Sequence, residues 1–88
     1  MLSLIKKLIV LNFGYHFAHI YDAEDKEINL FVKSLRGVSG VDSINWKKDL
    51  GIKIVFVLGN TNKVEIAMRE LISRFSLSIS RVQTKNYS

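Results

Sequence analysis

Two stretches of the chain place apolar side chains at helical spacing. Between Asp22 and Arg36, apolar residues recur at i, i+3, i+4 and i+7, which is one face of a helix. These residues are Ile28, Phe31, Val32 and Leu35. Asp22 is a good N-cap candidate, and acidic residues fill the first turns, where the helix dipole favours negative charge. Gly37 is placed to end the helix in the left-handed conformation.

A second apolar stripe predicts a helix from about Asn62 to Phe75, after a candidate cap at Asn60 or Thr61. Its members are Val64, Met68, Leu71, Ile72 and Phe75. Lysine, arginine and glutamate occupy the opposite side. The two predicted helices are therefore both amphipathic, and each buries one face.

Strand-like segments lie between and after the helices. Val41 to Lys48 alternates, with Ile44 and Trp46 on one face and Val41 on the other. Gly51 to Leu58 is β-branched and almost uniformly apolar, and the short connector before it predicts a hairpin. After the second helix, Ser76 to Val82 has the alternation of a half-buried edge strand, with Leu77 and Ile79 turned inward. Residues 83–88 carry no apolar stripe and are expected to fray.

The first twenty-one residues allow several interpretations. Lys7 to Phe13 and Tyr15 to Tyr21 are both typical of extended chain, so they form either one long strand bulged at Gly14 or two strands joined there. A helix near the start is a third interpretation, because Leu2, Ile5 and Ile9 have helical spacing. The β-branched and aromatic content favours strand.

The element order predicts the fold. Strand, helix, strand, strand, helix, strand describes two βαβ units joined by a hairpin, which is the ferredoxin-like α+β sandwich. Residues 1–88 form one domain, with a four-stranded antiparallel sheet and both helices on one face. Right-handed crossovers place the first and third strands in the centre. Those two strands are the most apolar, in agreement with this arrangement.

The third strand is apolar on both faces. Ile52, Ile54, Phe56 and Leu58 point one way, whereas Val55 and Val57 point the other. Since only one face can lie beneath the helices, the other presents apolar side chains to water or to a partner. We therefore expect self-association through the sheet. The candidate interface residues are Tyr15, Phe17, Val55 and Val57.

Composition narrows the chemistry. The absence of cysteine excludes disulfides, thiolate metal sites and a cysteine nucleophile, and it fits a cytoplasmic protein. The apolar run near the start is too short to span a bilayer and has no signal-peptide cleavage site. Thirteen Lys and Arg against eight Asp and Glu give a net charge of +5, which favours anionic partners.

The passage from the first helix into the second strand resembles a known family. The run Val32-Lys33-Ser34-Leu35-Arg36-Gly37-Val38-Ser39-Gly40-Val41-Asp42-Ser43-Ile44 is similar to the corresponding passage of heavy-metal-associated domains, and also to that of the cytoplasmic domains of cation diffusion facilitators. The resemblance implies a ferredoxin-like fold over about residues 28–82. Those domains bind soft cations through a CxxC, which this chain lacks, so metal binding is not carried over.

Few residues suggest catalysis. His16 and His19 share a face in a helix but not in a strand, and a metal site that combined them with the acids at 22–25 is imaginable. Helix capping accounts for those acids, and neither a Ser-His-Asp order nor a phosphate-binding glycine loop is present. We therefore expect no enzyme, no metal and no cofactor.

Nucleic acid is the strongest specific alternative. RNA-recognition domains share this topology and stack bases on aromatic residues of the central strands. The candidate basic contacts are Lys47, Lys48, Lys53, Arg81 and Lys85. However, the sequence signature of those domains is absent. The sequence thus predicts a non-enzymatic module that binds its own copies, a protein or a small ligand, with nucleic-acid binding on the open sheet face as the alternative.

Overall fold

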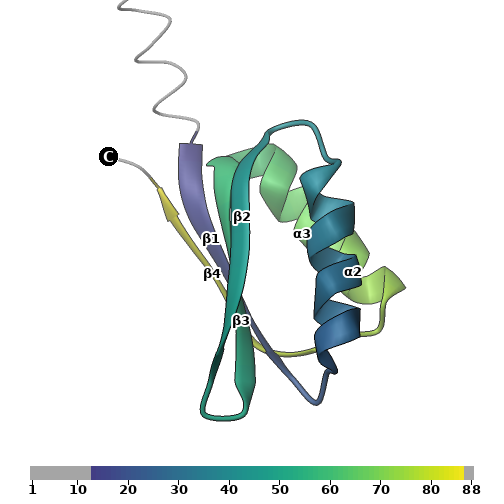
Figure 1. Ribbon diagram of the computed structural model, residues 1–88. Helices are drawn as coiled ribbons and strands as arrows, with labels where there is room; N and C mark the ends of the chain where they lie inside the picture. The colour runs from purple at the N-terminus through teal and green to yellow at the C-terminus, as the bar shows by residue number, and fades with distance from the viewer. Residues whose placement is uncertain (1–12, 87–88) are drawn as a thin grey trace, which may run out of the picture.

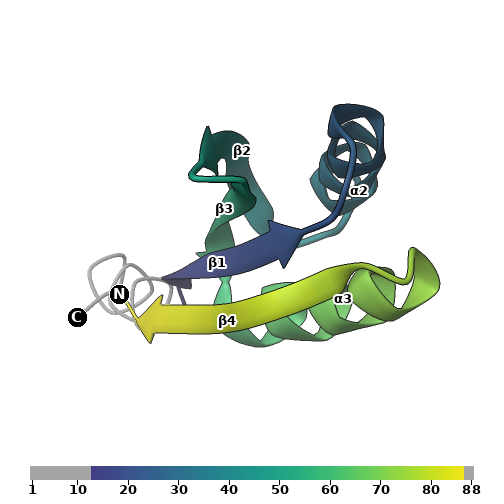
Figure 2. The same ribbon diagram turned by 90° about the horizontal axis from the view of Figure 1, so that it is seen from below.

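The predicted ferredoxin-like α+β fold is confirmed. A computed structural model describes residues 13–86, and predictions for residues 1–12 and 87–88 lie outside that part. The elements are β1 (Phe13–Tyr21), α2 (Asp25–Arg36), β2 (Val41–Asp49), β3 (Ile52–Asn60), α3 (Thr61–Arg74) and β4 (Ser78–Asn86). The four strands form one antiparallel sheet in the order β2-β3-β1-β4, with β1 and β3 central, and both helices lie on one face (Figures 1 and 2).

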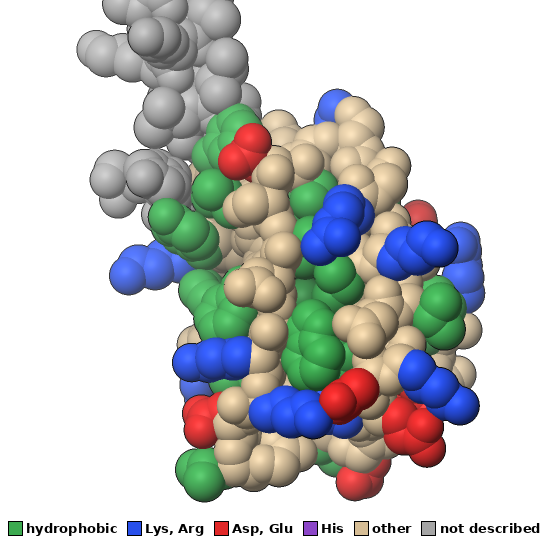
Figure 3. All heavy atoms as spheres, viewed as in Figure 1, with side chains coloured by type: hydrophobic (Ala, Val, Ile, Leu, Met, Phe, Trp, Pro, Cys, Tyr) green, Lys and Arg blue, Asp and Glu red, His purple; other side chains and the backbone are tan. Residues whose placement is uncertain are grey.

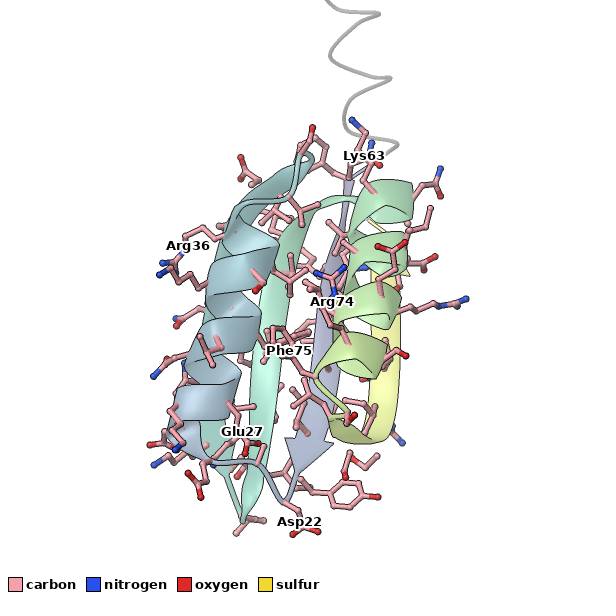
Figure 4. The ribbon with its side chains drawn as sticks, turned by 90° about the vertical axis from the view of Figure 1, so that its right-hand side faces the viewer. Asp22, Glu27, Arg36, Lys63, Arg74 and Phe75 are labelled. Atoms are coloured by element: carbon pink, nitrogen blue, oxygen red, sulfur yellow. The ribbon has the colours of Figure 1, made fainter. Side chains whose placement is uncertain are left out.

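The core lies between the helices and the covered face of the sheet. The predicted stripe of α2 is fully buried, and α3 buries Val64, Ala67, Met68 and Leu71. Beneath them lie the sheet residues Ala18, Ile20, Val55 and Val57. Figure 4 looks onto this layer and shows the two helices side by side, with Phe75 between them at the end of α3. Ile72 and Phe75, which the sequence placed in the buried stripe, are only partly buried and pack against the edge of the core.

The helix starts differ from one another. Asn60 caps α3 as predicted, since its side chain accepts a hydrogen bond from the Lys63 backbone N–H at 3.1 Å. The predicted cap of α2 at Asp22 is wrong, because α2 begins at Asp25 and Glu24 occupies the cap position without a side-chain hydrogen bond. Asp22 instead takes the left-handed conformation, with φ of 56°, which turns the chain between β1 and α2.

The turn from α2 to β2 depends on Gly40 rather than Gly37. Gly37 keeps right-handed helical angles (φ −82°), so the predicted left-handed ending there is wrong, and Gly40 has φ of +101°. The Gly40 carbonyl accepts a hydrogen bond from the Asn60 N–H at 2.8 Å. A Cβ at Gly59 would lie 2.3 Å from that same carbonyl oxygen, so this close approach requires glycine at position 59.

The hairpin between β2 and β3 has a two-residue turn. Asp49 pairs with Ile52, and the intervening Leu50 and Gly51 both have positive φ, 48° and 82°, as in a type I′ turn. This turn fixes the register of the hairpin, with Trp46 opposite Val55. Leu50, at the tip, is almost completely exposed.

Two strands contain one extra residue each. In β2 the pairing shifts between Val41 and Ser43, so Asp42 is extra and Val41 packs against the core on the same face as Ile44. The prediction that Val41 points to the opposite face is therefore wrong. In β4 the pairing with β1 shifts opposite His19 and Ile20, which leaves Ser80 as the extra residue.

The pairing at Gly14 is regular. This residue lies opposite Gly59 in β3 and Asn86 in β4, so the described part of β1 has no bulge there. β4 also continues to Asn86, four residues beyond the predicted end at Val82, because backbone hydrogen bonding to β1 needs no apolar stripe. Among residues 13–86, no helix is long and apolar enough to span a bilayer.

Candidate functional site

The sheet face opposite the two helices is the candidate site, and no element within residues 13–86 covers it. We call it the open face. Strand register places on it Tyr15, Phe17 and His19 of β1 and, directly opposite, Leu58, Phe56 and Ile54 of β3. Figure 3 shows hydrophobic side chains along the side of the sheet away from the helices, with Lys and Arg side chains among them.

Aromatic rings form the centre of the open face. Phe17 and Phe56 meet edge to face, with ring centroids 5.3 Å apart and planes at 84°. Tyr15 continues the row, with its ring centroid 6.5 Å from that of Phe17 and the planes at 26°. A hollow of ≈ 410 Å³ lies where Tyr15, Phe56 and Leu58 meet Asn45 of β2. The aromatic row is thus a contiguous apolar surface with one shallow depression.

Basic side chains border this surface on the two edge strands. Lys47 of β2 lies opposite Ile54, and its Nζ is 5.5 Å from the centroid of the Phe56 ring, which is within cation–π range. On β4, Lys85 lies opposite Tyr15, and Arg81 lies opposite His19. The bulge at Ser80 determines this direction, because strict alternation from Ile79 through Ser80 would turn Arg81 toward the helices.

Two of the predicted basic contacts lie elsewhere. Lys48 and Lys53 both pair with Asp25 at the start of α2, at 2.7 Å and 3.2 Å. Lys53 also donates to the Ala23 carbonyl. Hydrogen bonds from Lys48 and Lys53 lower the pKa of Asp25 below its usual value. These lysines therefore tie the β2–β3 hairpin to α2 and are not available to a ligand on the open face.

Two of the predicted interface residues are also placed on the wrong face. Val55 and Val57 are 0% and 1% exposed and lie beneath the helices, so they cannot contact a partner. The alternate residues Ile54, Phe56 and Leu58 lie on the open face instead. The two-residue hairpin turn would have allowed the correct face to be predicted from the sequence, because it pairs Val55 with Trp46. Trp46 belongs to the only apolar face of β2, so its neighbour must share the core.

The two histidines lie on opposite faces of β1, as the strand interpretation predicted. His19 is half-buried on the open face, whereas His16 is 1% exposed on the covered face. Within the described residues, no group of three or more His, Asp or Glu side chains is arranged to hold a metal ion. The His16 Nδ1 atom lies 3.2 Å from the Thr84 hydroxyl.

Comparison with known proteins gives similarity of fold only. No protein-family model and no curated protein matches the chain. The solved structure of MupZ from Pseudomonas fluorescens has a TM-score of 0.61 at 7% identity, over 83% of this chain and 66% of that chain. The structure of PH0061 has a TM-score of 0.53 at 17% identity, over 96% of this chain and 55% of that chain.

The chain thus spans about two thirds and about half of the lengths of these two proteins. Identities this low show a shared arrangement of strands and helices and nothing of a shared activity. Neither name identifies a heavy-metal-associated domain or a cation diffusion facilitator, so that resemblance stays a prediction.

Proposed function

We propose that this chain is a small assembly module that self-associates through its open face. One observation carries the proposal: a contiguous apolar patch lies on the two central strands, opposite the helices. Its members are Tyr15, Phe17, Ile54, Phe56 and Leu58. Contiguous apolar surface of this kind is costly to leave in water and commonly marks an interaction site.

The arrangement of charge on the open face supports the same conclusion. Protein interfaces have an apolar centre rich in aromatic residues and a polar rim, in which arginine is tolerated well. Here the aromatic and aliphatic side chains lie on β1 and β3, and the cations Lys47, Arg81 and Lys85 lie on the edge strands. The rim charges of two copies can remain solvated while the centres pack together.

The size of the open face is adequate for a dimer. Each strand has nine residues. At about 3.3 Å per residue and about 4.8 Å between strands, four such strands cover a flat area of roughly 570 Å². Side chains roughen that plane, so its accessible area approaches the roughly 800 Å² that each partner buries in a standard interface. A second copy of the chain is therefore an occupant of matching size.

Sedimentation velocity over a wide range of protein and salt concentrations tests this proposal. We expect an oligomer that persists at high salt, because its contacts are apolar. Leu58→Lys places a charge within the patch, opposite Tyr15, and should give a monomer that is still folded by circular dichroism. Leu50→Lys is the matched control, since it makes the same change at the exposed hairpin tip and should leave the oligomer intact.

A monomer at every concentration would refute the proposal. Equal oligomerisation of the two variants would also refute it, because the open face would then make no contribution. The absorbance ratio of the purified protein is recorded in the same runs. Salt-released material with a nucleic-acid spectrum on a monomeric protein would favour the second candidate function.

The second candidate is binding of single-stranded nucleic acid on the same face. The observation that favours it is the Lys47 ammonium 5.5 Å from the centre of the Phe56 ring, because bases stack on aromatic rings while cations contact the phosphates. Ile54 and Leu58 have no use in such stacking, and for this reason self-association ranks first.

Fluorescence anisotropy with a single-stranded oligonucleotide over a salt series tests the second candidate. Exchange of the three open-face cations Lys47, Arg81 and Lys85 for glutamine should reduce the slope of log K against log salt by about 2, at about 0.7 per phosphate contact. The matched control removes three cations from α2, namely Lys26, Lys33 and Arg36. Equal loss of binding in both variants would indicate only a net-charge effect.

A further inference from the structure

A second hollow lies at the opposite side of the sheet, between α3 and the edge strand β4. Its volume is ≈ 280 Å³, just below the range of about 300–1,000 Å³ for small-molecule pockets. Buried His16 and Met68 form the inner wall, and Arg69, Val82 and Thr84 form the exposed rim. The hollow shares none of these residues with the open face, so it is an independent candidate site.

The inner wall carries a polar atom without a partner. His16 is 1% exposed, and its Nε2 atom is fully buried with no hydrogen-bond partner among residues 13–86. Buried polar atoms are nearly always paired, and leaving one unpaired is unfavourable. Burial lowers the pKa of His16, and the negative charge of Glu65 opposes this only in part. The ring is therefore neutral at pH 7, with one nitrogen able to donate and the other to accept.

Opposite charges lie at the same hollow. Glu65 and Arg69 are one turn apart on α3, and both side chains line the hollow. In the described part of the chain, neither forms an ion pair, although a Glu and an Arg at this spacing commonly do. Both the carboxylate and the guanidinium remain available to a ligand with complementary charges.

The rest of the lining is apolar. Met68 and Ile72 contribute side chains from α3, and Val82 contributes one from β4. Val82 lies opposite Ala18, and so faces the helices, because the bulge at Ser80 shifts the alternation of β4 by one residue. A ligand that fits must therefore combine a small aliphatic part with both an anionic and a cationic group.

We propose that this hollow binds a small aliphatic α-amino acid. Arg69 contacts the carboxylate, Glu65 contacts the ammonium group, and the aliphatic side chain packs on Met68, Ile72 and Val82. His16 forms part of the inner wall beneath the ligand, so binding in the hollow changes the surroundings of its imidazole ring.

Three probes of equal aliphatic shape separate the contributions. L-Leucine carries both charges, 4-methylpentanoate only the carboxylate, and 3-methylbutylamine only the ammonium group. Each is titrated into the full chain and followed by the imidazole resonances of His16 in NMR spectra, because a site at this hollow must shift them. We expect saturable binding of leucine, with the two singly charged probes each at least tenfold weaker.

Variants test the assigned contacts. Glu65→Gln and Arg69→Gln should each weaken leucine binding about tenfold, whereas Glu70→Gln and Arg74→Gln, on the same helix but outside the hollow, should leave it unchanged. These four exposed or half-exposed positions tolerate glutamine without loss of the fold.

Several results would overturn the proposal. No shift of the His16 resonances with any probe would show that the hollow takes no such ligand. Binding of 4-methylpentanoate as tightly as leucine would remove the role of Glu65, and with it the amino-acid class. Binding that is equally weakened by the control pair would place the site elsewhere on α3.

Discussion

Substitution of Gly59 by alanine tests the packing of the turn before β2 against the end of β3. A Cβ at this position would lie 2.3 Å from the Gly40 carbonyl oxygen and 2.9 Å from Val64 Cγ2. The first contact is with backbone, so the two segments must separate. Separation weakens the 2.8 Å hydrogen bond from the Asn60 N–H to that carbonyl, a loss of about 0.5–1.5 kcal/mol, and overpacking adds about 1–3 kcal/mol.

We therefore expect Gly59→Ala to lower the free energy of unfolding by about 3 kcal/mol. With an m-value of about 1 kcal/mol per molar, the urea midpoint falls by about 3 M. Gly37→Ala is the matched control, because its φ is −82° and the new Cβ would lie 3.6 Å from the nearest atom. That change should raise stability by about 0.4–1 kcal/mol.

Urea unfolding of the three proteins at one protein concentration, followed by circular dichroism, measures both effects. Equal concentration matters because the proposed self-association would stabilise the folded state. A loss below about 1 kcal/mol for Gly59→Ala would refute the reasoning, since the overpacking term alone reaches that value. A comparable loss for Gly37→Ala would also refute it, because an added methyl group would then destabilise the protein even at a position with room for it.

Two further predictions concern pH. Burial lowers the pKa of His16 in the folded state below 6.5, and the charged groups that face it from α3 are Glu65 and Arg69. As pH falls, His16 therefore takes up a proton in the unfolded chain before it does so in the folded protein. The free energy of unfolding then decreases from about pH 6.5 down through the lower folded pKa. His16→Gln should flatten this part of a curve of stability against pH. The pKa of Asp25 is also lowered in the folded protein, so the charged carboxylate stabilises the fold at pH values above its ordinary pKa of 3.8. This contribution is lost as the pH falls below that value. Asp25→Asn should therefore unfold at lower urea than the parent at pH 7, with the difference vanishing in acid; an unchanged difference would exclude the ion pairs as its cause.

Sequence periodicity predicts the fold here because local preference and topology agree. The helical stripe led by Ile28 in α2 is buried as expected, and that led by Val64 in α3 is buried except for Ile72 and Phe75, which are partly buried. The most apolar strands, β1 and β3, occupy the centre of the sheet. In the two helices the hydrophobic effect acts on an apolar spacing that only a helix can bring to one face.

Periodicity predicts the site less well, for two physical reasons. Alternation along β3 separates Phe56 from Val55, but both faces are apolar, so alternation cannot say which one the helices cover. That choice depends on the partner strand, through the register that the hairpin turn sets. The second reason is the extra residue in β4, which decides that Arg81 faces outward. Nothing in the local composition around Ser80 predicts its position, because a bulge is specified by tertiary pairing.

The partners of Lys53 are residues distant from it in the sequence. Its position next to β-branched residues gives it no signature of a structural lysine, yet it joins β3 to Asp25 and Ala23 across the start of α2. The sequence shows only a positive charge on a strand. Whether such a charge binds a ligand or holds two elements together depends on which acid the fold brings within reach.

The bulge in β4 interrupts the alternation of the strand by one position. Ile79 before it and Val82 after it both face the helices, although they are three residues apart and regular alternation repeats every two. Because the bulge absorbs the extra residue, the pairing beyond it does not depend on Ser80 itself. Deletion of Ser80 would place Arg81 directly after Ile79, and unbroken alternation would keep Arg81 and Lys85 on the open face and Val82 toward the helices. A chain that lacks this residue would therefore keep both candidate sites, and its alignment with this one needs a gap at residue 80.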